Sequence, residues 1–308
     1  MGLPSVRIYE VSPRDGLQNE ATVVPTAQKA ELIARLAGAG LTDIEVTSFV
    51  RARWIPQLAD AEELIPVLPR GTGATWWGLV PNRVGLERAL ESGVRHIATF
   101  LSASETHNKK NVNRTVRESL AGIEEVISVA RDEGMRVRSY ISTVFGCPYE
   151  GEVAPAATLE LARKLLAAGA DEIVLGDTVG LGNPRQVQEI LALLTGEGIP
   201  LERLSVHFHD TRGTALANAL TAWQCGIGTF DASVGGLGGC PYAPGAAGNL
   251  ATEDLVYMFN GMGVKTGVDL EALAEAGAFA GEVLGRDLGG RYQQAWRGER
   301  RRAASRTA

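Results

Sequence analysis

Short runs rich in β-branched residues alternate with longer amphipathic stretches along this chain of 308 residues. In the longer stretches apolar side chains recur at helical spacing, as Ala30, Ile33, Ala34 and Ala37 do near the N-terminus. The short runs predict strands at residues 6–11, 43–47, 74–80, 94–101, 136–143, 172–175, 204–208 and 229–234. The longer stretches predict helices at 26–37, 58–68, 84–92, 115–133, 155–168, 184–194, 215–224 and 252–260.

Eight consecutive strand–helix pairs predict parallel strands joined by helical crossovers. Eight such units fit a closed (β/α)8 barrel, or TIM barrel, better than an open sheet. Residues 270–297 are expected to form one or two extra C-terminal helices that pack on the barrel. We therefore expect one α/β domain over residues 1–297 and a basic, flexible tail over residues 298–308.

The composition argues against several classes of protein. With 30 basic and 36 acidic residues the net charge is −6, which argues against a nucleic-acid partner. The three cysteines, Cys147, Cys225 and Cys240, include no CxxC pair and argue against a disulfide framework. No apolar stretch approaches the ~18 residues of a membrane span, and residues 1–6 lack a signal-peptide pattern. We expect a cytoplasmic protein with no membrane partner.

In such a barrel the functional side chains lie in the loops that follow the strands. Arg14 and Asp15 leave the first predicted strand side by side, although a surface ion pair with a turn at Gly16 is an equally good interpretation. His207 and His209 end the seventh strand two positions apart, so both imidazoles project from the same face. The chain has only four histidines, and this pairing favours metal ligation over structural hydrogen bonding.

A glycine-rich loop follows the eighth predicted strand, carries Cys240 and ends near Asn249. Glycines allow turns with positive φ and a close approach of the backbone to a ligand. A thiol on a mobile loop above the barrel mouth is typical of a lid that closes over a substrate. A flexible loop without a function is the alternative interpretation.

Two carboxylates lie in otherwise apolar strands, Glu45 within the second and Asp177 at the end of the sixth. Such a carboxylate is costly unless it has a partner, which favours an interior position. Two nitrogen and two oxygen ligands are offered together by Asp15, His207, His209 and Asn249. This mixed set leaves positions of an octahedral ion open to substrate, which suits Mg²⁺ or Mn²⁺ better than a closed thiolate zinc site. Zinc, which histidine also suits, is the alternative.

Five segments resemble 3-hydroxy-3-methylglutaryl-CoA lyases. They are V-x-P-R-D-G-L-Q-N-E, G-C-P-Y-E-G, L-G-D-T-V-G, H-F-H-D-T and G-L-G-G-C-P-Y-A-P-G-A-A-G-N-L-A-T-E-D-L-V-Y-M. The resemblance covers most of the chain, residues 5–285, and the last of these segments, the glycine-cysteine loop, is its most specific part. The H-x-H and R-D elements are shared with a wider family of metal-dependent barrels that includes isopropylmalate, homocitrate and citramalate synthases.

The resemblance implies a barrel that cleaves 3-hydroxy-3-methylglutaryl-CoA to acetoacetate and acetyl-CoA with the help of a divalent cation. The metal ligands of the family match Asp15, His207, His209 and Asn249. Its catalytic groups match Arg14, Glu45, Asp177 and Cys240. Its substrate pocket matches Arg14, Gln18 and Tyr140. From the chemistry of proton transfer, His207 or Asp177, near the metal, could take the hydroxyl proton as base or relay. A homodimer is expected from the resemblance and from the prevalence of symmetric dimers.

The chemistry of this cleavage agrees with those roles. A divalent ion makes the C3 hydroxyl of the substrate more acidic and orients the substrate. Arg14 is permanently cationic and suits the negative charge on the acetyl-CoA enolate, and Glu45 would position Arg14 or a proton-relay water. The thiol of Cys240, which is ordinarily protonated at neutral pH, can return a proton to carbon.

The chain departs from the family pattern at Ala21, Phe208 and Arg212. These positions concern CoA affinity and acyl-chain preference more than the type of reaction. A lyase for citramalyl-CoA or for a longer 3-alkyl-3-hydroxyglutaryl-CoA is therefore the main alternative. A Claisen-type synthase and a barrel without catalytic activity are further alternatives.

Overall fold

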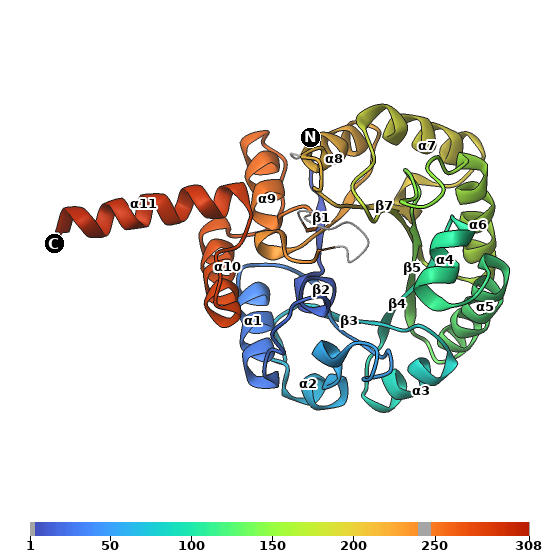
Figure 1. Ribbon diagram of the computed structural model, residues 1–308, viewed down its shortest axis with the longest axis horizontal. Coiled ribbons are helices and arrows are strands. Elements are labelled where there is room, and N and C mark those ends of the chain that lie inside the picture. Colours follow the sequence, from blue (N-terminus) through green and yellow to red (C-terminus); the bar gives the residue numbers. More distant parts are fainter. Residues whose placement is uncertain (1–3, 240–247, 308) are drawn as a thin grey trace.

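The computed structural model describes residues 4–239 and 248–307, and its centre is a closed barrel of eight parallel strands (Figure 1). The strands follow one another around the ring in sequence order, and β1 pairs with β8 to close it. They are β1 (Arg7–Glu10), β2 (Asp43–Ser48), β3 (Thr75–Leu79), β4 (His96–Ser102), β5 (Arg136–Ser142), β6 (Glu172–Asp177), β7 (Leu204–Phe208) and β8 (Thr229–Ala232). The prediction of a (β/α)8 barrel is confirmed.

Helices surround the barrel and connect successive strands (Figure 1). The connecting helices, and the one that follows β8, are α1 (Thr26–Gly38), α2 (Ala61–Val67), α3 (Arg83–Glu91), α5 (Val116–Asp132), α6 (Pro155–Ala168), α7 (Pro184–Gly196), α8 (Ala215–Gln224) and α9 (Thr252–Gly261). Their apolar side chains recur at helical spacing, as Leu32, Ile33 and Leu36 do in α1. These side chains belong to the same core as Ile44 of β2 and Ile97 of β4, which are fully buried.

Two helical segments differ from the prediction. Residues 58–68 do not form one helix, because the short turn η2 (Pro56–Leu58) precedes α2 and is separate from it. Helix α4 (Glu105–Val112) is not predicted by the sequence, because its polar residues show no apolar periodicity. Its ends stabilise it instead: the Ser104 side chain accepts a hydrogen bond from the first turn, and Asn113 ends the helix with φ of 57°.

Polar side chains occupy the inside of the barrel. The Tyr140 hydroxyl of β5 lies 3.0 Å from Glu45 Oε2 of β2 and 2.7 Å from Asp231 Oδ2 of β8. These three strands are not neighbours in the ring, so their side chains can meet only in its interior. Branched aliphatic side chains fill the interior of most such barrels. A charged interior therefore points to a role other than packing.

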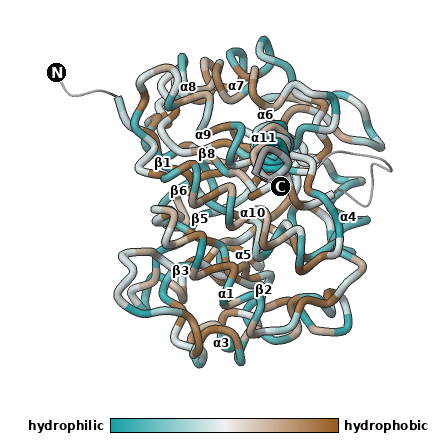
Figure 2. Tube along the Cα trace, turned by 90° about the vertical axis from the view of Figure 1, so that its left-hand side faces the viewer, coloured by the Kyte–Doolittle hydropathy of each residue, from teal (hydrophilic) through white to brown (hydrophobic). Residues whose placement is uncertain are grey.

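The C-terminal helices lie outside the ring of strands. Helix α10 (Leu270–Leu284) packs against α1, whereas α11 (Arg291–Thr307) projects away from the barrel (Figure 1). The segment predicted as a flexible tail, 298–308, is helical up to the end of α11, and Arg300 in it pairs with Glu275 of α10 at 3.0 Å. Figure 2 shows α11 nearly end-on and largely hydrophilic. Within residues 4–239 and 248–307, no helix has the length and hydropathy needed to cross a bilayer.

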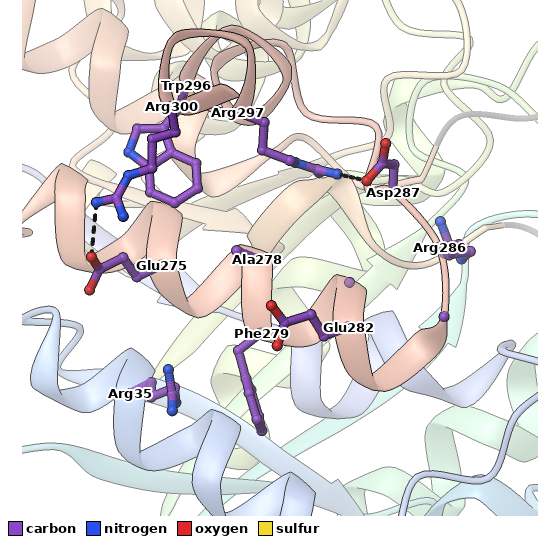
Figure 3. Close-up of a pocket in the computed structure, with 12 residues that line it drawn as sticks. Arg35, Glu275, Ala278, Phe279, Glu282, Arg286, Asp287, Trp296, Arg297 and Arg300 are labelled. Carbon is purple, nitrogen blue, oxygen red and sulfur yellow. Dashed lines mark hydrogen bonds and ion pairs between the residues drawn. The ribbon is translucent and has the colours of Figure 1, made fainter. Parts of the chain in front are cut away.

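A groove runs between α1, α10 and α11 (Figure 3). Several of its arginines have partners: Arg297 pairs with Asp287, and the Arg35 guanidinium lies over the Phe279 ring, 4.4 Å from its centre. Of the residues predicted to be catalytic or metal-binding, none that the structure describes lines this groove. The predicted site residues that are described lie instead in and above the barrel.

Helix α5 begins with a capping box in which Thr115 Oγ1 accepts from the Glu118 amide and the Glu118 carboxylate accepts from the Thr115 amide. Thr115→Ala is expected to lower the free energy of unfolding by about 1 kcal/mol, because the Glu118 amide loses its partner. Urea unfolding followed by circular dichroism measures the change. Ser128→Ala on the exposed face of the same helix is the control, and no loss is expected there because alanine is the better helix former. Equal losses in both variants would contradict the capping argument.

Candidate active site

Asp15, His207 and His209 form a buried cluster at the carboxyl ends of β1 and β7. Their ligand atoms lie within 4.8 Å of one another, and His209 Nε2 is 4.0 Å from Asp15 Oδ2. Strand β1 leads almost directly into the turn η1 (Ser12–Gly16), which carries Asp15. Asn249 joins the cluster, because its Nδ2 donates to Asp15 Oδ2 over 2.6 Å and its backbone bridges to His209. The four residues predicted as metal ligands therefore lie together.

The cluster suits a divalent cation. Asn249 Oδ1 and His209 Nδ1 are buried and have no hydrogen-bond partner among the described residues. Burial raises the pKa of Asp15, but Arg14 and the two histidines outweigh burial and lower that pKa to about 2. Burial and the neighbouring His207 lower the pKa of His209 to about 3. An ionised carboxylate and a neutral imidazole are the forms that bind a metal, and this oxygen and nitrogen set fits Mg²⁺ or Mn²⁺.

Arg14 is held beside the cluster by two carboxylates. Its Nε donates to Glu45 Oε1 over 2.5 Å, and its Nη1 donates to Asp15 Oδ1 over 2.6 Å. Gln18 Nε2 donates to the same Asp15 oxygen over 2.8 Å. Arg14 is only 6% exposed and Asp15 only 9%, so the interpretation as a surface ion pair is wrong. Arg14 and Gln18 therefore contact the cluster directly at Asp15, and Glu45 is linked to it through Arg14.

Tyr140 connects Glu45 to two residues that sequence reasoning missed. Asp231 Oδ2, which accepts from the Tyr140 hydroxyl, also lies 3.1 Å from His207 Nδ1. Arg138 Nη2 donates to Asp231 Oδ1 over 2.9 Å. Asp231 is a charged side chain in a mostly apolar strand, which is the signal that singled out Glu45, whereas the strand of Arg138 contains several other polar residues. The signal could have identified Asp231 as an interior residue, but it could not have shown that the two residues are partners.

Asp177 lies at the end of β6 and accepts two backbone hydrogen bonds. The amides of Leu181 and Gly182 each donate to one of its oxygens over 2.9 Å. Burial raises the pKa of Asp177 to about 6, although these amides and the nearby His207 oppose the rise. The chain also carries Cys240, the remaining residue predicted to be catalytic, which lies outside the described residues.

Two buried carboxylates hold the turn η4 (Val234–Gly236), which leads into the glycine-cysteine loop. The Val234 amide donates to Glu10 Oε1 over 2.9 Å, and the Gly235 amide donates to the two oxygens of Glu253 over 2.7 and 3.0 Å. Gly235 has φ of 62°, and a Cβ there would lie 2.4 Å from a leucine side chain, so only glycine fits. The start of this loop is therefore anchored to the barrel core.

Glu253 predicts a dependence of stability on pH. Burial raises the pKa of this carboxyl to about 8, and the nearby Glu10 carboxylate adds to the rise. The folded state therefore holds the proton more tightly than the unfolded state. The stability that this proton contributes is fully present below the ordinary glutamate pKa and is lost as pH rises toward 8.

Glu253→Gln, which resembles the protonated acid, is expected to reduce the loss of stability between about pH 5 and 8 by up to about 1.4 kcal/mol per pH unit. Urea unfolding of the wild type and the variant across this range measures the difference. A difference that does not change with pH would contradict the raised pKa.

A family model described as HMGL-like matches residues 5–279. The chain belongs to the HMGL-like family. Relatives of this HMGL-like chain include the bovine mitochondrial hydroxymethylglutaryl-CoA lyase, which is 49% identical over 94% of this chain and 89% of its own length. The rat cytoplasmic 3-hydroxy-3-methylglutaryl-CoA lyase is 50% identical over 96% of this chain and 86% of its own length. The resemblance seen in the sequence motifs is confirmed.

Solved structures resemble the HMGL-like chain over nearly its full length. The crystal structure of the Bacillus subtilis HMG-CoA lyase superposes with a TM-score of 0.93 at 48% identity, covering 96% of this chain and 100% of that one. The HMG-CoA lyase of Acinetobacter baumannii, solved in complex with coenzyme A and 3-methylmalate, superposes with a TM-score of 0.90 at 40% identity. This second match covers 94% of this chain and 95% of that one.

Proposed function

We propose that this chain is an enzyme that cleaves 3-hydroxy-3-methylglutaryl-CoA to acetoacetate and acetyl-CoA. Curated relatives at 49% and 50% identity, both named as lyases for this thioester, support the proposal. The observation that carries it is the buried cluster of Asp15, His207, His209 and Asn249, with Arg14 fixed beside it.

The reaction breaks the bond between C2 and C3 of the acyl chain. The C3 hydroxyl loses its proton, and its oxygen becomes the ketone oxygen of acetoacetate. The electron pair of the broken bond moves onto the acetyl-CoA fragment, which becomes an enolate and then takes up a proton at C2. The site must therefore remove one proton, stabilise an enolate and return one proton.

The residues that would hold Mg²⁺ or Mn²⁺ are Asp15, His207, His209 and Asn249. A bound divalent cation would orient the substrate and make its C3 hydroxyl more acidic. Gln18, whose side-chain amide is held by Asp15, would contact the substrate next to this cluster.

Arg14 would stabilise the enolate. Its Nε and Nη1 are bonded to Glu45 and Asp15, which, among the described residues, leaves Nη2 for the thioester oxygen of the substrate. Both carboxylates fix the guanidinium before substrate binds. The guanidinium therefore does not have to reorient when negative charge develops on the substrate. Glu45 is therefore assigned the positioning of Arg14.

Asp177 is the better candidate for the base that takes the hydroxyl proton. His207 has Nδ1 next to Asp231 at 3.1 Å, and its other nitrogen would bind the metal, so it has no lone pair left. Asp177 has a pKa of about 6, which suits a base that operates near neutral pH. Cys240, on the glycine-cysteine loop, would return the proton to C2 as a thiol acid.

The proposal is tested by measuring acetyl-CoA release from 3-hydroxy-3-methylglutaryl-CoA with Mg²⁺ or Mn²⁺, and after removal of metal with EDTA. Metal-dependent release that collapses in Cys240→Ala and persists in Cys225→Ala would support both the reaction and the acid. Release that persists in EDTA would remove the metal from the mechanism. Release of acetyl-CoA only from citramalyl-CoA or a longer 3-alkyl-3-hydroxyglutaryl-CoA would contradict the proposed substrate.

The oligomeric state and the cellular location of the protein are predictions from the sequence. A homodimer is expected, and light scattering coupled to size-exclusion chromatography measures it. The relatives include proteins named as mitochondrial and as cytoplasmic, so the cytoplasmic location predicted from the sequence rests on the sequence alone.

A further inference from the structure

Asp231 has three hydrogen-bond partners among the described residues inside the barrel. Its Oδ2 accepts from the Tyr140 hydroxyl over 2.7 Å and lies 3.1 Å from His207 Nδ1, while its Oδ1 accepts from Arg138 Nη2 over 2.9 Å. Its side chain is 0% exposed. The parallel register of β7 and β8 pairs His207 directly with Asp231, so the contact is built into the sheet. A carboxylate in this position needs a partner of opposite charge, and Arg138 supplies it.

Arg138 is itself held on several sides. Its Nη2 also donates to Ser205 Oγ over 3.0 Å and to Glu172 Oε1 over 2.8 Å, and its guanidinium lies 3.6 Å from the centre of the Tyr9 ring. The residue is fully buried. Replacing such buried ionic groups with apolar side chains of similar volume is often neutral or stabilising. Stability alone therefore does not account for this arrangement, and the contact between Asp231 and His207 suggests what does.

The structure assigns Asp231, held in place by Arg138, as the positioning residue of the metal ligand His207. An ionised carboxylate only accepts hydrogen bonds, so His207 Nδ1 must carry the hydrogen in this contact. The neutral ring then has its lone pair on Nε2, which is the nitrogen available to a cation shared with Asp15 and His209. This inference rests on the proposed metal site, and Asp231 itself does not bind the metal.

The Asp231 carboxylate is also connected, through Tyr140, to the part of the site that contains Glu45 and Arg14. Tyr140 lies between Asp231 and Glu45, and Glu45 in turn bonds Arg14. Because the Tyr140 hydroxyl has one hydrogen, Asp231 competes for this donor with Glu45, the carboxylate that holds Arg14. A change at Asp231 should alter metal binding directly and substrate turnover as a consequence.

The test is Mn²⁺ binding by metal-free protein, measured by isothermal titration calorimetry. Asp231→Asn is expected to weaken the affinity for Mn²⁺ by about 10–100-fold, because loss of such an outer partner has this effect. An asparagine amide can also donate to Nδ1, which would move the ring hydrogen to Nε2 and block the ligand. The matched control is Glu172→Gln, which removes another carboxylate from the same Arg138 nitrogen without touching His207. Its Mn²⁺ affinity is expected to equal that of the wild type.

A second measurement uses the wild-type protein and does not depend on any variant folding. Nitrogen-15 NMR of the four histidine rings in metal-free protein reports which nitrogen carries hydrogen, and His207 is expected to carry it on Nδ1. Hydrogen on Nε2, or equal Mn²⁺ affinities in folded Asp231→Asn and wild type, would overturn the inference. Wild-type protein that binds no Mn²⁺ would instead overturn the proposed metal site, so the two failures are distinct.

Discussion

Arg14→Met is expected to lower kcat for cleavage of 3-hydroxy-3-methylglutaryl-CoA by about 10²–10³-fold with a smaller change in KM. The guanidinium is bonded to Glu45 and Asp15 in the free enzyme, so it is already oriented when negative charge develops on the substrate. Removing one such preorganised donor costs this much in other oxyanion sites. Initial rates of acetyl-CoA release over a range of substrate concentrations separate kcat from KM.

Arg14→Lys is the matched variant for this test. Lysine keeps the charge but lacks the planar fork that reaches Glu45, Asp15 and the substrate together, so it is expected to recover little activity. Arg14→Met also leaves the fully buried Glu45 without its cation, which lowers stability. The double variant Arg14→Met/Glu45→Gln removes that unpaired charge. If the double variant regains the stability of the wild type but not its activity, the result supports the catalytic role of Arg14. Full activity in Arg14→Met would rule that role out.

Asp15→Asn is expected to abolish measurable binding of Mn²⁺ and to lower metal-dependent activity by more than about 10³-fold. Asp15 is the one carboxylate among the four proposed ligands, and the pKa of its side chain is held at about 2, so it carries a full charge at neutral pH. Asparagine has nearly the same shape, but it is neutral and would place an amide beside His209 or Asn249. Calorimetry with metal-free protein measures the binding, and the release assay measures the activity.

Asp210→Asn is the control for this second prediction. Asp210 directly follows the proposed ligand His209, but its side chain accepts from the Ala215 amide at the start of α8. Asparagine can accept the same hydrogen bond, so metal binding and activity are expected to persist. Unchanged Mn²⁺ affinity in Asp15→Asn, or an equal loss in both variants, would contradict the assignment of Asp15 as a ligand.

Much of the secondary structure could be predicted because its signals are local. Helices α6 and α8 and strand β7 have the bounds that the sequence predicts, since apolar spacing and end signals involve only neighbouring residues. Helix α4 escaped prediction because capping at Ser104, rather than periodicity, stabilises it. The helical course of residues 298–307 escaped it as well, because Arg300 finds its partner on another helix.

Several residues of the candidate site could also be predicted from the sequence, for a related reason. Asp15, Asp177 and His207 lie at or just after the ends of strands, where a barrel gathers its functional groups, so position along the chain identified them. Asp231 carried the same signal of a charge within a mostly apolar strand, whereas Arg138 lies in a strand with several polar residues, and the significance of both depends on which side chains they contact. That information is not present in any short stretch of sequence.

Types of element, their order and the chemical nature of the candidate residues were thus readable from the chain alone, because each depends on residues close together in it. Which of these side chains contact one another depends on closure of the barrel. It brings Asn249 within 2.6 Å of Asp15 across a separation of 234 positions. The register of β7 against β8 sets His207 opposite Asp231. Such pairings follow from the packing of the whole ring, in which every strand must satisfy two neighbours at once, and no local pattern of residues encodes them.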